Sequence, residues 1–187
     1  MKHLIILSGV ALLALALSAC SDDEASTGTV RVTLQDAPAN VEKLLVPVSE
    51  VAIHFVPQGQ TETAPDDAAA DPGDDPETAG WRTILAEEKT FDLLTLKDNP
   101  TDLGDLELVA GKITQIRLYI SETAKTKVTV AGVEHDVEVP SGKVKIVGNV
   151  DVVPGDETVL ALDFDALDSL KEQAAGYKLV PTIKLLR

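Results

Sequence analysis

Polar and apolar residues alternate with a period of two along many short segments of this chain, and this alternation constrains the fold most. The clearest example is the segment 112–121, in which Ile116, Leu118 and Ile120 fall on one face and the residues between them on the other. Successive residues of a β-strand point to opposite faces of a sheet, so the pattern predicts a half-buried strand. Similar patterns predict strands at 28–35, 41–56, 81–85, 90–96, 127–130, 133–139, 143–147, 150–153, 158–164 and 177–187.

The long strand segment 41–56 changes the parity of its alternation. Val48 and Val51 both belong to its apolar set although three positions separate them, which predicts a bulge or bend near Ser49-Glu50. Pro47 also suits a bulge or an edge, because proline has no N–H group to donate to a neighbouring strand.

Turn residues separate the strand segments. Ala131-Gly132 predicts a hairpin turn between two short strands. Pro181 interrupts the last strand segment, and Asp36-Ala-Pro38 predicts a turn in which the Asp36 carboxylate accepts backbone N–H groups. The segment 102–109 does not fit a single pattern.

One helix is expected after the strand at 158–164. Asp165 is a suitable N-cap, and Asp168 stands three residues later in a capping-box-like position. Strong helix formers fill 166–175, and Gly176 fits the position after the last helical residue. Roughly nine or ten short strands with one short crossover helix predict a mostly β fold, a β-sandwich.

The N-terminus has the organisation of a bacterial lipoprotein signal peptide, at 1–19. A basic start is followed by an apolar run, Leu4 to Leu17, that is shorter than the ~20 residues of a spanning helix. The run ends in Leu17-Ser18-Ala19-Cys20, which matches the lipobox pattern Leu-x-small-Cys. We therefore expect cleavage before Cys20 and attachment of diacylglycerol and a fatty acyl chain, which anchor the protein in a membrane.

The expected location follows from this anchor. Residues 20–27 would form a lipidated tether at the cell envelope. Ser21 is not the Asp that retains enteric lipoproteins in the inner membrane, so it favours the outer membrane if the organism is Gram-negative. The sequence leaves open whether the domain faces the periplasm or the cell surface.

The charge of the chain excludes some partners and marks one loop. The net charge is −15, which argues against a nucleic-acid partner because phosphate contacts need basic residues. Seven of the 31 acidic residues lie in 57–80, together with four prolines and no Lys or Arg. Such a segment cannot bury enough apolar surface to offset its ordering entropy, so we expect a disordered loop inside one domain at 28–187.

Eight stretches of the chain resemble one known family. They are 28–40 (GTVRVTLQDAPAN), 46–55 (VPVSEVAIHF), Trp81, 91–96 (FDLLTL), 110–120 (AGKITQIRLYI), 139–142 (VPSG), 160–170 (LALDFDALDSL) and 177–185 (YKLVPTIKL). On these motifs the chain is similar to the DUF 4382 family, a domain of unknown function in bacterial and archaeal envelope lipoproteins. The resemblance implies a transthyretin-like or carboxypeptidase-regulatory-like β-sandwich and no particular activity. The chain departs from the family at Ile113, where Tyr is usual, and in its longer acidic loop.

No motif for catalysis or for a cofactor is present. Of three histidines, His54 and His135 would remain after processing, and neither lies in a local Ser-His-Asp pattern. We therefore expect a protein without enzymatic activity and without a cofactor. Asp163, Asp165 and Asp168 are candidate Ca²⁺ ligands, and the alternative is that they cap and flank the helix.

Three residues are candidate contacts for a ligand: Trp81, Arg117 and Tyr119. Aromatic and Arg side chains anchor many glycan and protein sites, so the leading hypothesis is a lipid-anchored, non-catalytic module that binds a glycan or another envelope protein. The alternative is a structural component that adds a strand edge to a partner's sheet. A third hypothesis is a Ca²⁺-responsive module.

Overall fold

The computed structural model describes residues 26–37, 41–61, 77–97 and 99–186. The expected signal peptide, Cys20, most of the tether and the middle of the acidic loop lie outside the described residues. Of that loop, Pro57 ends one strand and Gly80 begins the next. No helix in the described part of the chain is long and apolar enough to cross a membrane.

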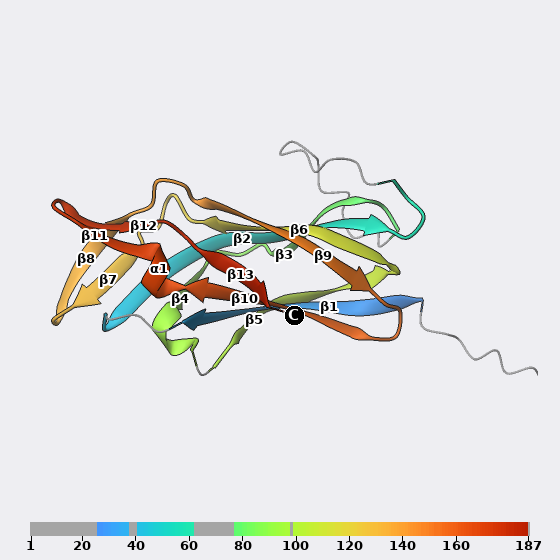
Figure 1. The fold of residues 1–187 in the computed structure, drawn as a ribbon, viewed down its shortest axis with the longest axis horizontal. Helices are drawn as coiled ribbons and strands as arrows, with labels where there is room; N and C mark the ends of the chain where they lie inside the picture. Colours follow the sequence, from blue (N-terminus) through green and yellow to red (C-terminus); the bar gives the residue numbers. More distant parts are fainter. Residues whose placement is uncertain (1–25, 38–40, 62–76, 98, 187) are drawn as a thin grey trace, which may run out of the picture.

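The chain forms two β-sheets that pack face to face (Figure 1). The elements are β1 (Thr27–Ala37), β2 (Lys43–Pro57), β3 (Gly80–Leu85), β4 (Lys89–Asp92), the 3-10 turn η1 (Leu93–Thr95), β5 (Thr101–Val109), β6 (Gly111–Ile120), β7 (Lys127–Val130), β8 (Val133–Glu138), β9 (Lys143–Val152), β10 (Glu157–Asp165), α1 (Ala166–Ser169), β11 (Leu170–Gln173), β12 (Gly176–Leu179) and β13 (Ile183–Leu186). The predicted β-sandwich is confirmed.

The smaller sheet has the strand order β13-β10-β1-β5, with β1 and β10 parallel. The larger sheet has the order β11-β12-β8-β7-β2-β6-β9. In addition, β3 and β4 each pair with β2. The 15-residue β2 therefore contacts four strands and organises the larger sheet.

The core lies between the two sheets and follows the predicted alternation. On β10, Leu160, Leu162 and Phe164 are buried, while β6 contributes Ile116 and Leu118. Removing each such side chain from water contributes about 1.5–3 kcal/mol to folding. Period-two alternation places all of them on the inner face of their strands.

The predicted bulge in β2 is present. Its pairing with β6 shifts register between Val48 and Glu50, at the position where the parity of the sequence changes. Pro47 lies beside this shift, and its carbonyl accepts the N–H of Ser121 at 2.8 Å. Ala131 and Gly132, with φ of 49° and 76°, form the predicted hairpin turn.

The helix expected over 166–175 is wrong beyond Ser169. Asp165 is the N-cap, and its side chain accepts the N–H of Asp168 at 2.9 Å, as predicted. After one turn the chain becomes β11, which pairs with β12 in an antiparallel hairpin. Gly176, at φ 132°, begins β12 and does not end a helix. Pairing with a later strand outweighs the helix propensity of these residues, because tertiary contacts commonly override intrinsic propensity.

Other segments join or divide differently from expectation. The segments 143–147 and 150–153 form the single strand β9, while 177–187 divides around Pro181 into β12 and β13. The segment 90–96 is β4 followed by η1, and 102–109 lies within β5.

The sandwich has two distinct ends (Figure 1). At one end β1 begins, and the carbonyl of Thr27 accepts the N–H of Gly155 from the β9–β10 turn at 2.9 Å. We call this the tether end. At the opposite end, β7, β8, β11 and β12 extend the larger sheet, and we call this the hairpin end.

Candidate functional site

Trp81 and Arg117, two of the three predicted ligand contacts, touch one another. The Arg117 guanidinium carbon lies 3.8 Å from the centroid of the Trp81 ring, within the range of a cation–π interaction. The Arg117 Nε donates to Gln115 Oε1 at 3.2 Å, and the His54 ring meets Trp81 edge-on at 5.2 Å. His54 Nδ1 shares a 2.8 Å hydrogen bond with Thr114 Oγ1.

Strand register explains why these residues meet. His54 on β2 lies opposite Trp81 on β3 and Gln115 on β6, and Ala52 lies opposite Arg117. Residues that pair directly across an antiparallel ladder share one face. All of them lie on the face of the larger sheet that points away from the core.

The Trp81–Arg117 cluster is nevertheless buried. Trp81 is 5% exposed, His54 4% and Arg117 2%. These side chains form a packed polar cluster and offer little open surface to a ligand. The sequence analysis did not identify His54, Thr114 or Gln115 as partners of Trp81 and Arg117. The alternation in the segment 112–121 did place Gln115 and Arg117 on the same strand face.

Tyr119, the third predicted contact, lies at a separate and more open place. It is half-buried and lines a groove of about 620 Å³ with residues of 120–123 and 140–143, together with Ser49 and Glu88. We call this the Tyr119 groove. The Lys143 Nζ lies 5.8 Å from the centroid of the Tyr119 ring, and Ser49 Oγ donates to the Tyr119 carbonyl at 3.3 Å.

The walls of the Tyr119 groove are held by local backbone contacts. A Cβ on Gly142 would lie 2.8 Å from the carbonyl oxygen of Ile120, so only glycine lets these two segments approach so closely. Ser121 Oγ accepts the N–H groups of Thr123 and Ala124 at 3.2 and 3.0 Å. The groove therefore presents an aromatic ring, hydroxyl groups and two exposed carboxylates, those of Glu88 and Glu122, on a fixed backbone.

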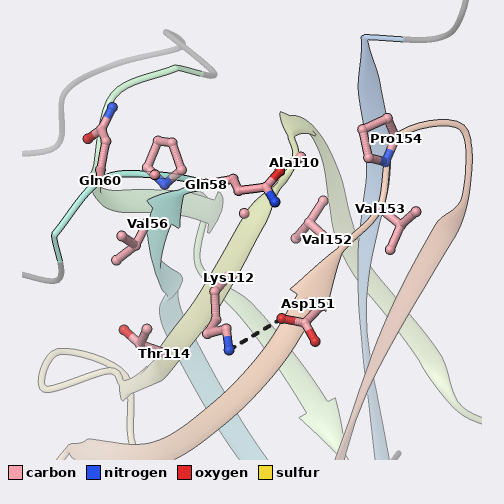
Figure 2. A pocket seen from close by; sticks show the side chains of 13 residues that line it. Val56, Gln58, Gln60, Ala110, Lys112, Thr114, Asp151, Val152, Val153 and Pro154 are labelled. Carbon is pink, nitrogen blue, oxygen red and sulfur yellow. Dashed lines mark ion pairs between the residues drawn. The ribbon is translucent and has the colours of Figure 1, made fainter.

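A second hollow, which the sequence did not indicate, lies at the tether end (Figure 2). It has a volume of about 690 Å³ and is formed by three segments, 56–60, 110–114 and 151–154. We call it the end pocket. Its ionisable groups are Lys112 and Asp151, which pair across β6 and β9 with an Nζ–Oδ1 distance of 3.4 Å.

The predicted carboxylate trio has structural roles. Asp165 caps α1, and its Oδ2 lies 3.5 Å from Lys184 Nζ, while Asp163 pairs in register with Gln35 and Lys184. Asp168 supplies the N–H that the cap accepts. Within the described ranges, no group of three or more His, Cys, Asp or Glu side chains is placed to hold a metal ion.

Asp36 connects two of the stretches that carry the family resemblance, 28–40 and 160–170. Its side chain is 4% exposed, and its Oδ1 accepts the N–H of Ala166, 130 residues away, at 3.0 Å. The stretches 34–37 and 163–166 thus meet where β1 and β10 run side by side. The Asp36 carboxylate therefore accepts a distant backbone N–H, and Pro38 of the turn predicted at Asp36-Ala-Pro38 lies outside the described residues.

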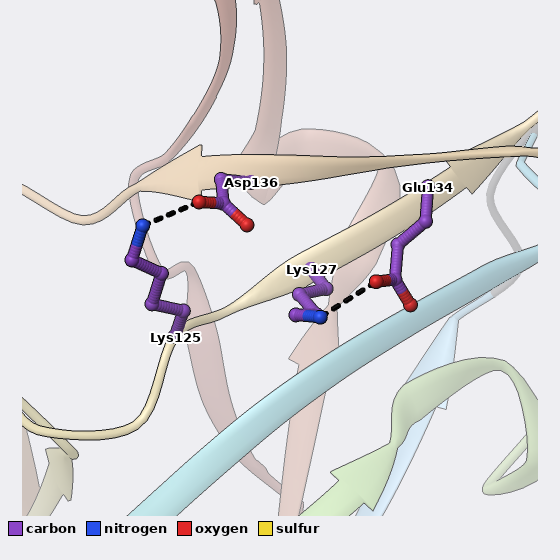
Figure 3. A network of polar contacts seen from close by, with 4 residues as sticks. All are labelled: Lys125, Lys127, Glu134 and Asp136. Atoms are coloured by element: carbon purple, nitrogen blue, oxygen red, sulfur yellow. Dashed lines mark hydrogen bonds and ion pairs between the residues drawn. The ribbon is translucent and has the colours of Figure 1, made fainter.

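The β7–β8 hairpin carries two exposed ion pairs (Figure 3). Lys127 Nζ lies 2.6 Å from Glu134 Oε1, and this hydrogen bond raises the pKa of Lys127 above 10.5. Lys125 binds Asp136 and lowers the pKa of its carboxyl below 3.8. His135, on the same strand, contacts the Tyr177 ring with 5.2 Å between centroids.

A family model described as "Domain of unknown function (DUF4382)" matches residues 27–181. No curated protein sequence matches the chain. Among solved structures, the sandwich is similar to that of a proposed cell adhesion protein from Bacteroides fragilis, with 11% sequence identity and a TM-score of 0.39. That match covers 86% of this chain and 45% of the other, so this chain spans less than half of that protein's length.

Proposed function

Since the chain belongs to the DUF4382 family, whose description assigns no activity, we propose its function from the described geometry: it is a lipid-anchored, non-catalytic binding module of the cell envelope. The lipobox ending in Cys20 supports the anchor. Its acyl chains would hold the protein in a membrane, with the outer membrane favoured in a Gram-negative organism. The tether at 20–27 leads directly into β1 at the tether end.

The observation that carries the binding role is the Tyr119 groove. A half-buried aromatic ring can pack against the apolar face of a sugar. Neighbouring protein hydroxyl groups donate hydrogen bonds to the sugar hydroxyls or accept them, and carboxylates accept them. Tyr119 is surrounded by groups of this kind, including Ser141 and Glu122. We assign the groove to a glycan of the envelope.

The position of the groove suits a ligand presented away from the anchoring membrane. The end pocket adjoins Gly111, at the start of β6, and the groove adjoins Ile120, at its end. Ten residues of strand place these two points about 30 Å apart. The groove therefore lies well removed from the end at which the tether enters.

In this proposal Trp81 and Arg117 support the groove and do not contact the ligand. Arg117 lies two residues before Tyr119 on β6, and Trp81 contacts Arg117 from β3 in the buried cluster. Arg117 and Tyr119 project from the same face of β6, so packing around Arg117 positions the strand that carries Tyr119.

Binding to isolated envelope polysaccharides tests the proposal. Tyr119→Ala should weaken retention of the full chain on a glycan that the parent binds by about tenfold, since aromatic contacts contribute about 1–1.5 kcal/mol. Tyr177→Ala is the matched control, because Tyr177 is also half-buried but contacts His135 near the hairpin end. Equal loss in both variants, or no retention of the parent on any envelope glycan, would contradict the assignment.

A further inference from the structure

We propose that the end pocket takes up an acyl chain of a zwitterionic phospholipid from the membrane that anchors the protein. This inference goes beyond glycan binding at the Tyr119 groove and rests on the proposed function only in the lipid anchor. Position, lining and hydrogen bonding of the pocket each support it.

The first argument is the distance from the membrane. Gly155 and Asp156 of the β9–β10 turn bond the backbone of Thr27 and Thr29 at 2.9 and 3.0 Å, so β1 begins against this turn. Val153 and Pro154, which precede the turn, line the pocket (Figure 2). Seven peptide bonds separate the Cα atoms of Cys20 and Thr27, so even a fully extended chain spans only about 25 Å between them. An anchored chain therefore holds the end pocket close to the bilayer surface.

The second argument is the apolar lining. Val56 and Val152 form buried walls, with 7% and 3% exposure, and Ala110 lies between the segments that carry them. Val153 is 48% exposed at the rim, beside the exposed Pro154. Each methylene that such a surface removes from water contributes about 0.8 kcal/mol, so the lining favours a hydrocarbon chain.

The third argument is that two backbone hydrogen bonds already close the loops around the pocket. Gln58 N–H donates to the Ala110 carbonyl at 2.8 Å, and Asp156 N–H donates to the Val153 carbonyl at 3.2 Å. A peptide strand docking here would need free N–H and C=O groups as partners. A hydrocarbon chain needs none, which favours a lipid over a peptide.

The charge of the polar groups that line the end pocket indicates which lipid headgroup it would accept. Lys112 and Asp151 form a pair without net charge, and Gln58 and Gln60 add neutral amides. The chain as a whole carries −15, which disfavours an anionic headgroup near its surface. A zwitterionic headgroup matches both the neutral mouth and the acidic protein.

Photo-cross-linking of the full-length acylated protein tests the inference. The protein is placed in phosphatidylcholine vesicles that contain a phosphatidylcholine with a diazirine in its acyl chain, and cross-linked peptides are identified by mass spectrometry. We expect labelling of peptides that contain 56–60, 110–114 and 151–154. Val153→Asp should reduce this labelling about tenfold, because it places a charge at the apolar rim. Val159→Asp is the matched control, since Val159 is 47% exposed on the smaller sheet, and it should leave the labelling unchanged.

Labelling that is equal in both variants, or spread over the hairpin end, would overturn the inference. A parallel sample carries the diazirine on the fatty acid attached to Cys20. If pocket peptides are cross-linked only in that sample, the occupant is the protein's own anchor and the inference is overturned. A second arm uses the full chain with Cys20→Ala and a short-chain diazirine phosphatidylcholine below its micelle concentration. Pocket labelling in this arm supports the inference without the anchor. Acylation of the parent is measured separately with a fatty-acid probe, so a failed anchor is distinguished from an empty pocket.

Discussion

Asp36 is the residue whose role extends furthest along the chain. Its carboxylate is buried and accepts the N–H of Ala166, the first residue of α1. That N–H would otherwise have no partner within the helix, because the first turn of a helix leaves its N–H groups unpaired. One side chain thus connects the end of β1 to the end of β10.

Asp36→Ala should lower the free energy of unfolding by about 1–3 kcal/mol, because it leaves the buried Ala166 N–H without this acceptor. Urea denaturation followed by the fluorescence of Trp81, the single tryptophan, measures the change. Asp105→Ala, at an exposed position on β5, is the control and should change stability by less than about 0.5 kcal/mol. An Asp36 variant as stable as the control would show that this hydrogen bond is dispensable.

Arg117 is the second residue with a clear energetic role. Arg117→Ala removes its contact with the Trp81 ring and its hydrogen bond to Gln115. We expect a loss of about 2–4 kcal/mol in unfolding free energy and stronger quenching of Trp81 fluorescence by acrylamide. Lys145, opposite Arg117 on β9, is exposed, so Lys145→Ala serves as the control and should change neither measurement. Unchanged quenching in the Arg117 variant would mean that Arg117 does not shield the ring.

Among the elements, the β7–β8 hairpin responds to pH through its two ion pairs. The ion pair with Lys125 lowers the pKa of Asp136 and stabilises the hairpin above pH 3.8. This stabilisation is lost as the pH falls through the lowered pKa. The ion pair with Glu134 raises the pKa of Lys127 and stabilises the hairpin below pH 10.5. This stabilisation is lost as the pH rises through the raised pKa. Both pairs are solvent-exposed, so salt weakens them.

An NMR titration of the Asp136 carboxyl group should have its midpoint below 3.8 because Lys125 binds the ionised form. Lys125→Met should bring the midpoint back toward 3.8. Lys127→Met, which removes the more distant charge, should shift it less. A midpoint at or above 3.8 in the parent protein would contradict the pairing seen in Figure 3.

The strand edges bear on the alternative hypothesis of assembly by edge pairing. β11, at the end of the larger sheet, has four residues and exposes Lys171 and Glu172. Short, charged edges discourage the addition of a partner strand. At the edge of the smaller sheet, Gly104 of β5 lies so close to the Ile84 carbonyl of β3 that a Cβ would come within 2.9 Å. These two edges therefore disfavour strand addition, whereas the ten-residue β9 at the other end of the larger sheet is a longer edge.

At the scale of the whole molecule, the proposed lipid anchor would determine which end of the sandwich faces the membrane. Cys20→Ala should abolish labelling by a fatty-acid probe and release the protein from the membrane fraction, because the anchor is lost. Ser21→Ala keeps the cysteine and should retain both labelling and membrane association. Continued labelling of the Cys20 variant would refute the anchor, and with it the orientation of the two ends.

The sequence by itself determined which residues of each strand face the core. Alternation is a local property, so Leu160, Leu162 and Phe164 on β10 were placed correctly, as were the bulge after Val48 and the cap at Asp165. These features depend on neighbours within a few positions, and the chain carries that information directly.

The tertiary structure alone decided what distant segments do together. The helix expected over 166–175 stops at Ser169 because β12 is available as a pairing partner. Trp81 and Arg117 meet because β3 and β6 both flank β2, and three separate segments form the end pocket beside the start of β1. Such contacts depend on the order in which strands assemble, and strand order is set by the packing of the whole sandwich.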